Sequence, residues 1–148
     1  AEITERLNRF EQEMSFDFIP GVLDFIADLH RNGVKTAVVT SSNEAKMAAV
    51  YRVHPEIKTL FDRILTAEMF TASKPAPDCF LLGMEVFGTT PDTTYVFEDS
   101  FNGIQSGKDA GMRVIGLSTT NPAESLRDKV YEVIPNFEKV TFEDYLRW

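Results

Sequence analysis

The chain has 148 residues, of which 43% are hydrophobic and 26% charged, and these values are typical of one globular domain with a substantial core. A net charge of −8 argues against a general binder of nucleic acid or anionic membranes, and no apolar run approaches the roughly 20 residues of a membrane span. The single cysteine, Cys79, excludes an internal disulfide framework and favours a reducing compartment, so we expect a cytoplasmic protein.

The chain opens with two predicted helices. The second begins at Pro20 and ends at Gly33, because proline is favoured in the first turn of a helix and glycine just beyond the last. The first covers residues 1–14, where apolar side chains recur at helical spacing: Ile3, Leu7, Phe10 and Met14.

Strands and helices then alternate along the chain. Apolar runs predict strands at residues 34–40, 61–65, 95–99, 113–117 and 131–134. Helices are expected at residues 41–54, 77–87, 100–110 and 122–129, the first of them with a capping box formed by Ser41 and Glu44. This order predicts an α/β fold with a parallel sheet between two helix layers. In such sheets the functional residues gather at the C-terminal ends of the strands.

Two of these helices have informative spacing. In the helix at 100–110, Gly103 and Gly107 lie one turn apart and make a smooth face that another element can approach closely. In the helix at 77–87, Cys79 is interpreted as a small core residue rather than a nucleophile. The predicted inner face of that helix consists of Phe80, Leu81, Met84 and Phe87.

Four polar residues, Thr40, Ser41, Ser42 and Asn43, follow the strand at 34–40 and precede a helix. They offer hydroxyl groups and backbone N–H groups at a helix N-terminus, where phosphate binds readily. The alternative is an ordinary helix cap without a ligand.

Charged residues follow two other strands. Lys74 lies in the loop after residues 61–65, where a cation could neutralise a phosphoryl group; the alternative is a solvated loop lysine. Glu98 and Asp99 end the strand at 95–99, and adjacent carboxylates suit Mg²⁺; alternatively, they cap the next helix. Together the three strand ends provide an anion-binding loop, a counter-charge and a metal site, which phosphoryl transfer requires.

Three segments, VVTSSN, SKPAPDCF and YVFEDSFNGIQSGKDAGMRVIGL, resemble three of the four signature motifs of the haloacid dehalogenase superfamily. The likeness is greatest to its β-phosphoglucomutase-like phosphatase branch and covers about residues 20–122. The resemblance implies a Rossmann-like three-layer core and a Mg²⁺-dependent phosphatase that acts on a small phosphorylated metabolite, such as a sugar phosphate, through an aspartyl-phosphate.

The resemblance also implies a role for each motif residue. Thr40 and Ser41 would bind the transferring phosphoryl group, with Ser42 and Asn43 close by. Lys74 would steady the phosphoryl group and the aspartyl nucleophile, so the implied catalytic residues of this chain are Lys74 and Thr40. Asp99 would be a Mg²⁺ ligand, and Glu98 would be a ligand directly or through water.

The sequence departs from the family at its start. The family begins with a strand that carries an Asp-x-Asp motif, whose first Asp is the nucleophile, and no such motif occurs in this chain. The resemblance therefore implies that residues 1–15 are a remnant of the helical cap and its linker and that residues 16–148 are an incomplete core domain. We accordingly expect the chain to be a fragment of a longer protein.

The missing strand is central in the family's sheet, between the strands that end at Thr40 and Asp99. Its loss would leave two unpaired strand edges, which is unfavourable. If the chain folds alone, we expect either closure of the sheet, with contacts between Val38 and Val96, or self-association that fills the gap.

Three other functions are compared with phosphate hydrolysis. A mutase of the β-phosphoglucomutase type resembles this chain at SKPAPD but typically carries a lysine where Asn43 stands, which favours hydrolysis. An inactive fragment would bind phosphate or Mg²⁺ without turnover, because the chain lacks the nucleophile. Dehalogenation of 2-halo acids is disfavoured, since that reaction needs no Mg²⁺ and would not use Glu98 and Asp99 as metal ligands.

Overall fold

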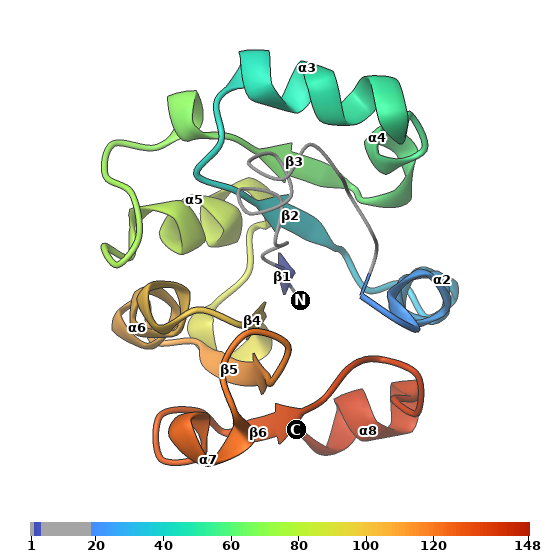
Figure 1. Cartoon of the computed structure of the whole chain (residues 1–148), viewed down its shortest axis with the longest axis vertical. Helices are drawn as coiled ribbons and strands as arrows, with labels where there is room; N and C mark the ends of the chain where they lie inside the picture. Colours follow the sequence, from blue (N-terminus) through green and yellow to red (C-terminus); the bar gives the residue numbers. More distant parts are fainter. Residues whose placement is uncertain (1, 4–18) are drawn as a thin grey trace.

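The computed structural model describes residues 2–3 and 19–148, which form an α/β fold with a six-stranded sheet (Figure 1). The strand order is β3-β2-β1-β4-β5-β6, and every neighbouring pair is parallel. The predicted fold class is therefore confirmed. The strands span Glu2–Ile3 (β1), Ala37–Val39 (β2), Arg63–Leu65 (β3), Tyr95–Glu98 (β4), Arg113–Leu117 (β5) and Glu132–Ile134 (β6).

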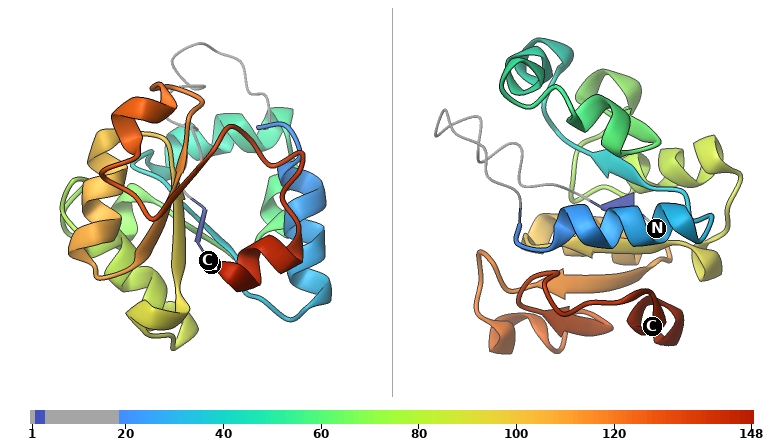
Figure 2. Two further views of the ribbon diagram at one scale, coloured as in Figure 1. Left: turned by 90° about the horizontal axis from the view of Figure 1, so that it is seen from below. Right: turned by 90° about the vertical axis from the view of Figure 1, so that its right-hand side faces the viewer.

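Helices cover both faces of this sheet. The left view of Figure 2 shows α5, α6 and α7 on one side and α2 and α8 on the other. No helix among the described residues is long and apolar enough to cross a membrane. The α-helices span Val22–Arg31 (α2), Glu44–Val53 (α3), Ile57–Leu60 (α4), Asp78–Phe87 (α5), Phe101–Asp109 (α6), Ala123–Leu126 (α7) and Phe142–Arg147 (α8), and the 3₁₀-helices Ala67–Met69 (η1) and Pro91–Thr93 (η2).

The core has two parts because successive strand residues face opposite sides of the sheet. Val38 of β2 and Phe97 of β4 pack in one hydrophobic cluster with Phe25 of α2. Their neighbours Val39 and Val96 belong to a second cluster beneath α5 and α6. Burial on both faces explains why these strands are continuous apolar runs rather than alternating ones.

The first described residues occupy the centre of the sheet. Ile3 of β1 pairs with Val38 of β2 and with Phe97 of β4, so the chain's own backbone separates these two strands. The helix predicted for residues 1–14 is therefore wrong at residues 2–3, and its remainder lies outside the described residues. The expected closure of the sheet through Val38 and Val96 is also wrong, and neither closure nor a second chain is needed to fill this place.

The start of α3 differs from its predicted cap. Asn43 is the N-cap residue, and its side chain accepts a hydrogen bond from the Lys46 backbone N–H at 2.8 Å. The predicted capping box of Ser41 and Glu44 is therefore wrong. The Glu44 carboxylate instead accepts a hydrogen bond of 2.7 Å from the Thr66 hydroxyl, a tertiary contact that local sequence spacing does not reveal.

Helices α5 and α6 pack closely against their surroundings. In α6, a methyl group at Gly107 would lie 2.8 Å from Cγ2 of Val114 in β5, which confirms the predicted close approach. In α5 the buried residues are Cys79, Phe80 and Gly83, whereas Leu81 is 43% exposed, so the predicted inner face is wrong at Leu81. The burial of Cys79 agrees with its interpretation as a core residue.

Candidate functional site

A buried ion pair joins two of the three predicted strand ends. Lys74 Nζ lies 3.1 Å from Glu98 Oε2 at the end of β4 and donates a hydrogen bond to the Val39 carbonyl oxygen at the end of β2, at 3.3 Å. The side chains of Lys74 and Glu98 are only 10% and 3% exposed. The loop after β3 therefore delivers its cation to the C-terminal edge of β2 and β4, and Lys74 is not a solvated loop lysine.

Both carboxylate oxygens of Glu98 accept hydrogen bonds. Oε1 accepts from the backbone N–H groups of Asp99 and Ser100 at 3.1 and 3.2 Å and from the Ser100 hydroxyl at 3.1 Å, while Oε2 accepts from Lys74. Burial raises the pKa of the Glu98 carboxyl above its ordinary value, and the nearby Lys74 ammonium opposes this increase. Its partners thus favour the charged form that burial disfavours.

Gly103 in the first turn of α6 makes room for this carboxylate. A methyl group at Gly103 would lie 2.0 Å from Cδ of Glu98 and 2.1 Å from its Oε2, far inside contact distance. Ser100, the N-cap of α6, accepts a hydrogen bond from the Gly103 N–H at 3.0 Å. The predicted smooth face of α6 is therefore the surface on which the Glu98 side chain lies.

Asp99 is held by a loop that the sequence analysis did not identify as part of the site. Its Oδ2 accepts hydrogen bonds from the hydroxyls of Thr120 at 2.7 Å and Thr119 at 3.3 Å, and its backbone oxygen accepts from the Asn121 side-chain amide at 3.2 Å. These residues follow β5, the strand beside β4. The polar run directly after an apolar strand is the signal that could have revealed them.

The predicted phosphate-binding residues lie together between β2 and α3. Thr40 and Ser42 are buried, and the Ser42 backbone N–H donates a hydrogen bond to the Thr40 hydroxyl oxygen at 3.1 Å. Ser41, between Thr40 and Ser42 in the sequence, is partly buried. Asn43 is exposed and uses its side-chain oxygen to cap α3. The run therefore forms a helix cap, and its position beside the Val39–Lys74 contact brings it to the same edge as the ion pair.

The described residues fit a metal ion only in part. They contain no group of three or more His, Cys, Asp or Glu side chains that could hold one. Mg²⁺ commonly takes only one or two carboxylates and completes its shell with water and substrate phosphate, so the buried Asp99 carboxylate suits it. Glu98 is less suited to direct coordination, because both of its oxygens already accept hydrogen bonds from protein groups.

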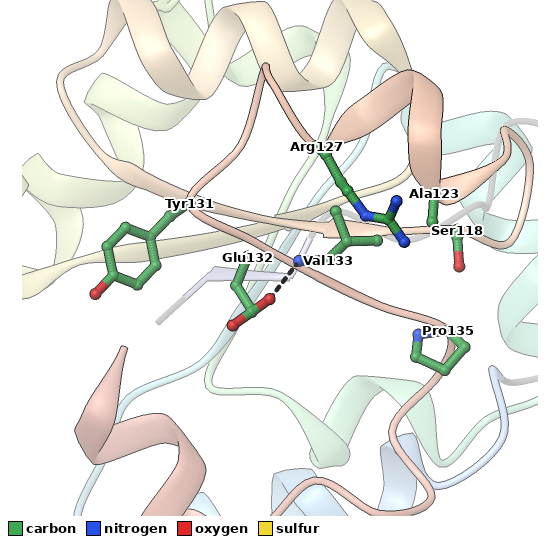
Figure 3. Close-up of a pocket in the computed structure, with 7 residues that line it drawn as sticks. All are labelled: Ser118, Ala123, Arg127, Tyr131, Glu132, Val133 and Pro135. Atoms are coloured by element: carbon green, nitrogen blue, oxygen red, sulfur yellow. Dashed lines mark hydrogen bonds between the residues drawn. The ribbon is translucent and has the colours of Figure 1, made fainter.

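A cavity of about 390 Å³ lies beside α7 and the outer strand β6 (Figure 3). Figure 3 shows Arg127 extending over Val133, with Ser118 and Pro135 near one end and Tyr131 at the other. None of the predicted site residues lines this cavity, so the candidate site rests on the grouping of Lys74, Glu98, Asp99 and the Thr40 loop rather than on a pocket.

Known proteins are similar to this chain in sequence and in fold. Residues 1–117 match the family described as haloacid dehalogenase-like hydrolase. The chain is 33% identical over 115 residues to protein CbbY of Cereibacter sphaeroides, covering 76% of this chain and 50% of that protein. It is 31% identical over 128 residues to hexitol phosphatase A of Escherichia coli, covering 83% and 56%. β-Phosphoglucomutases are also among its relatives.

The fold agrees with a crystal structure of CbbY from Rhodobacter sphaeroides, a mutant in complex with xylulose 1,5-bisphosphate. The TM-score is 0.73 at 27% identity, and the match covers 90% of this chain and 61% of that one. This chain thus spans about half the length of the two curated relatives compared above. Because the family match extends over residues 1–117 of 148, the chain belongs to the haloacid dehalogenase-like hydrolase family.

Proposed function

We propose that the protein containing this chain is a Mg²⁺-dependent phosphatase of a small phosphorylated metabolite with a sugar or polyol skeleton. The observation that carries this proposal is the contact of Lys74 Nζ with the Val39 carbonyl oxygen and with Glu98. It brings a cation to the strand edge that also carries the Thr40 loop and Asp99. Membership of a hydrolase family and similarity to hexitol phosphatase A support the reaction class.

In this proposal the Thr40 hydroxyl and the adjoining Ser41 bind the transferring phosphoryl group through hydrogen bonds. Ser42 and Asn43 shape the loop through their own hydrogen bonds. Lys74 provides the positive charge that stabilises the phosphoryl oxygens during transfer. The catalytic residues of this chain are therefore Lys74 and Thr40. Glu98 orients Lys74 through the ion pair and leaves the direct metal contact to its neighbour Asp99.

Asp99 would hold Mg²⁺ together with water and the substrate phosphate, with Glu98 taking part through water. The bound ion would neutralise phosphate charge. The hydroxyls of Thr119 and Thr120 fix the Asp99 carboxylate in one orientation, which suits a ligand. The nucleophile is the remaining requirement. We propose that it is an aspartate of an Asp-x-Asp motif outside residues 1–148, because these residues contain no such motif, and that the strand of this motif takes the place of β1 between β2 and β4 in the longer protein.

Phosphate release by the full-length protein tests this function. The substrates would be sugar and polyol monophosphates, each assayed with Mg²⁺ and again after EDTA. We expect release of inorganic phosphate that EDTA abolishes and that Asp99→Asn lowers by orders of magnitude. Conversion of a 1-phosphate into a 6-phosphate without phosphate release would instead assign the mutase reaction. Phosphate binding without any turnover would assign the inactive alternative.

A further inference from the structure

Ser106 of α6 is a fully buried polar residue outside the set of candidate site residues. Its hydroxyl donates a hydrogen bond of 2.6 Å to the backbone carbonyl oxygen of Ala76. Helices α5 and α6 lie side by side, and Ala76 belongs to the loop that leads into α5 (Figure 1). A hydroxyl is costly to bury without a partner, so the contact with Ala76 is what allows a serine at this position.

The direction of this hydrogen bond follows from the chemistry of its partners. The Ala76 carbonyl oxygen can only accept, so it takes the single hydroxyl proton of Ser106. The thiol of Cys79 in α5, whose Sγ lies 3.5 Å from Ser106 Oγ, is therefore the donor in the second contact. The hydrogen bonds run from thiol to hydroxyl to carbonyl oxygen, and they end on the loop.

The carbonyl group that Ser106 holds belongs to the turn that carries Lys74. The Ala76 backbone N–H donates a hydrogen bond of 3.1 Å to the Ser73 carbonyl oxygen and closes a turn over residues 73–76, with Lys74 inside it. Ala76 is thus bound within the turn through its N–H and to α6 through its carbonyl oxygen. The turn cannot shift relative to α6 without breaking the hydrogen bond from Ser106.

Helix α6 contacts both members of the buried ion pair or the backbone that carries them. Gly103, in its first turn, leaves the space that the Glu98 carboxylate occupies. Ser106 follows three residues later, on the same side of the helix, and holds the turn of Lys74. The distance of 3.1 Å between Lys74 Nζ and Glu98 Oε2 is therefore controlled from one helix on both sides.

From this arrangement we infer that Ser106 is a positioning residue for Lys74. The inference rests on the proposed phosphatase function and adds to it a residue that acts without touching the substrate. A lysine side chain is flexible, so its ammonium group reaches one place only if the backbone that carries it is held. Without the Ser106 hydroxyl the turn can shift, and Lys74 then brings its charge less accurately to the phosphoryl oxygens in the transition state.

The test measures kcat and KM of the full-length protein for p-nitrophenyl phosphate with Mg²⁺ in Ser106→Ala and Cys79→Ala. Each change deletes one heavy atom from a fully buried side chain, but only the first removes the hydrogen bond to Ala76. We expect kcat to fall about tenfold in Ser106→Ala, with KM changed less than about twofold, because Lys74 acts mainly in the transition state. Cys79→Ala should keep kcat within about twofold of the unmodified protein.

A further variant shows whether Ser106 acts through Lys74. Lys74→Met/Glu98→Gln lacks both charges of the ion pair, so adding Ser106→Ala to it should lower the residual kcat no further. The same proportional loss of kcat with and without Lys74 is the result expected of a purely structural serine, and it overturns the inference. Equal kcat values in Ser106→Ala and Cys79→Ala overturn it as well.

NMR of the protein with isotope-labelled lysine gives a measurement that needs no turnover. Hydrogen bonds and burial protect the Lys74 ammonium protons from exchange with water. We expect their signal in the unmodified protein and in Cys79→Ala, and its broadening or loss in Ser106→Ala. An unchanged signal in Ser106→Ala overturns the inference and leaves the phosphatase proposal intact. Absence of turnover by the unmodified protein with every phosphate ester overturns the phosphatase proposal, while the expected NMR result still supports Ser106 as the residue that positions Lys74.

Discussion

Lys74 Nζ and Glu98 Oε2 lie 3.1 Å apart in a buried ion pair that connects the loop after β3 with the end of β4. Removing either partner would leave a buried charge whose desolvation is no longer offset. The pair therefore couples the stability of this edge of the sheet to the position of the cation that we propose for phosphoryl transfer.

Lys74→Met tests this coupling. The substitution leaves the Glu98 carboxylate buried without its cation, and we expect a loss of about 3 to 5 kcal/mol in the free energy of unfolding, measured by urea denaturation. Phosphatase activity of the full-length protein should fall at least about a hundredfold, because the positive charge at the phosphoryl group is lost.

The double variant Lys74→Met/Glu98→Gln separates the two effects. It removes both charges, so most of the lost stability should return while activity stays low. A double variant as unstable as Lys74→Met alone would show that the charge pair is not the source of the destabilisation.

Gly103→Ala should disturb the site through sterics alone. The added methyl group would lie 2.0 Å from Cδ of Glu98, so either the carboxylate or α6 must move. We expect lower stability together with reduced activity in the full-length protein, measured by thermal unfolding and phosphate release.

Gly107→Ala is the matched control for this change in the same helix. Its methyl group would lie 2.8 Å from Val114 Cγ2 and does not meet Glu98, so stability should fall with a much smaller effect on activity per unit of stability lost. Equal losses of activity in variants of matched stability would contradict the proposed link between Gly103 and Glu98.

Thr120→Val should raise the Mg²⁺ concentration needed for half-maximal activity. The Thr120 hydroxyl donates a 2.7 Å hydrogen bond to Asp99 Oδ2, and without it the proposed metal ligand is less well oriented. A Mg²⁺ titration of phosphate release measures the effect. Thr119→Val should shift the titration less, because its hydrogen bond to the same oxygen is longer, at 3.3 Å. Unchanged Mg²⁺ dependence in both variants would argue against Asp99 as the ligand.

The sequence was informative where a local pattern determines the structure. The apolar run that ends in Glu98 and Asp99 predicted a buried strand with two carboxylates at its C-terminal end, and β4 has this form. Continuous apolar runs predicted strands buried on both faces. Gly103 and Gly107 lie one turn apart on a helix and predicted that another part of the protein approaches this face closely, because glycine has no side chain to prevent it.

Tertiary partners could not be predicted in this way. Nothing near Glu98 in the sequence indicates that Lys74 binds one of its oxygens, and nothing near Ala76 indicates Ser106, which lies 30 residues later. β1 has only two residues, which are too few to show a strand pattern. In the sequence these residues begin a run with helical periodicity, so they were assigned to a helix. Thr120 was missed because a polar loop residue becomes recognisable only once Asp99 lies beside it.

The last helix offers a prediction that depends on pH. Hydrogen bonds from the Thr141 backbone N–H and hydroxyl to Asp144 Oδ2, at 2.9 and 3.1 Å, lower the pKa of the Asp144 carboxyl below its ordinary value of 3.8. Because the folded pKa is the lower one, ionised Asp144 stabilises the protein above the unfolded value, and this contribution is lost as the pH falls through the folded value. Asp144→Asn should therefore be less stable than the unmodified protein at pH 7, by about 0.5 kcal/mol, with a gap that narrows as the pH falls from about 5 to 3. Glu143→Gln removes a charge from the neighbouring, exposed position and serves as the control in the same urea titrations. A gap that is constant over this pH range, or equal in the two variants, would show that the α8 cap does not depend on the ionised Asp144.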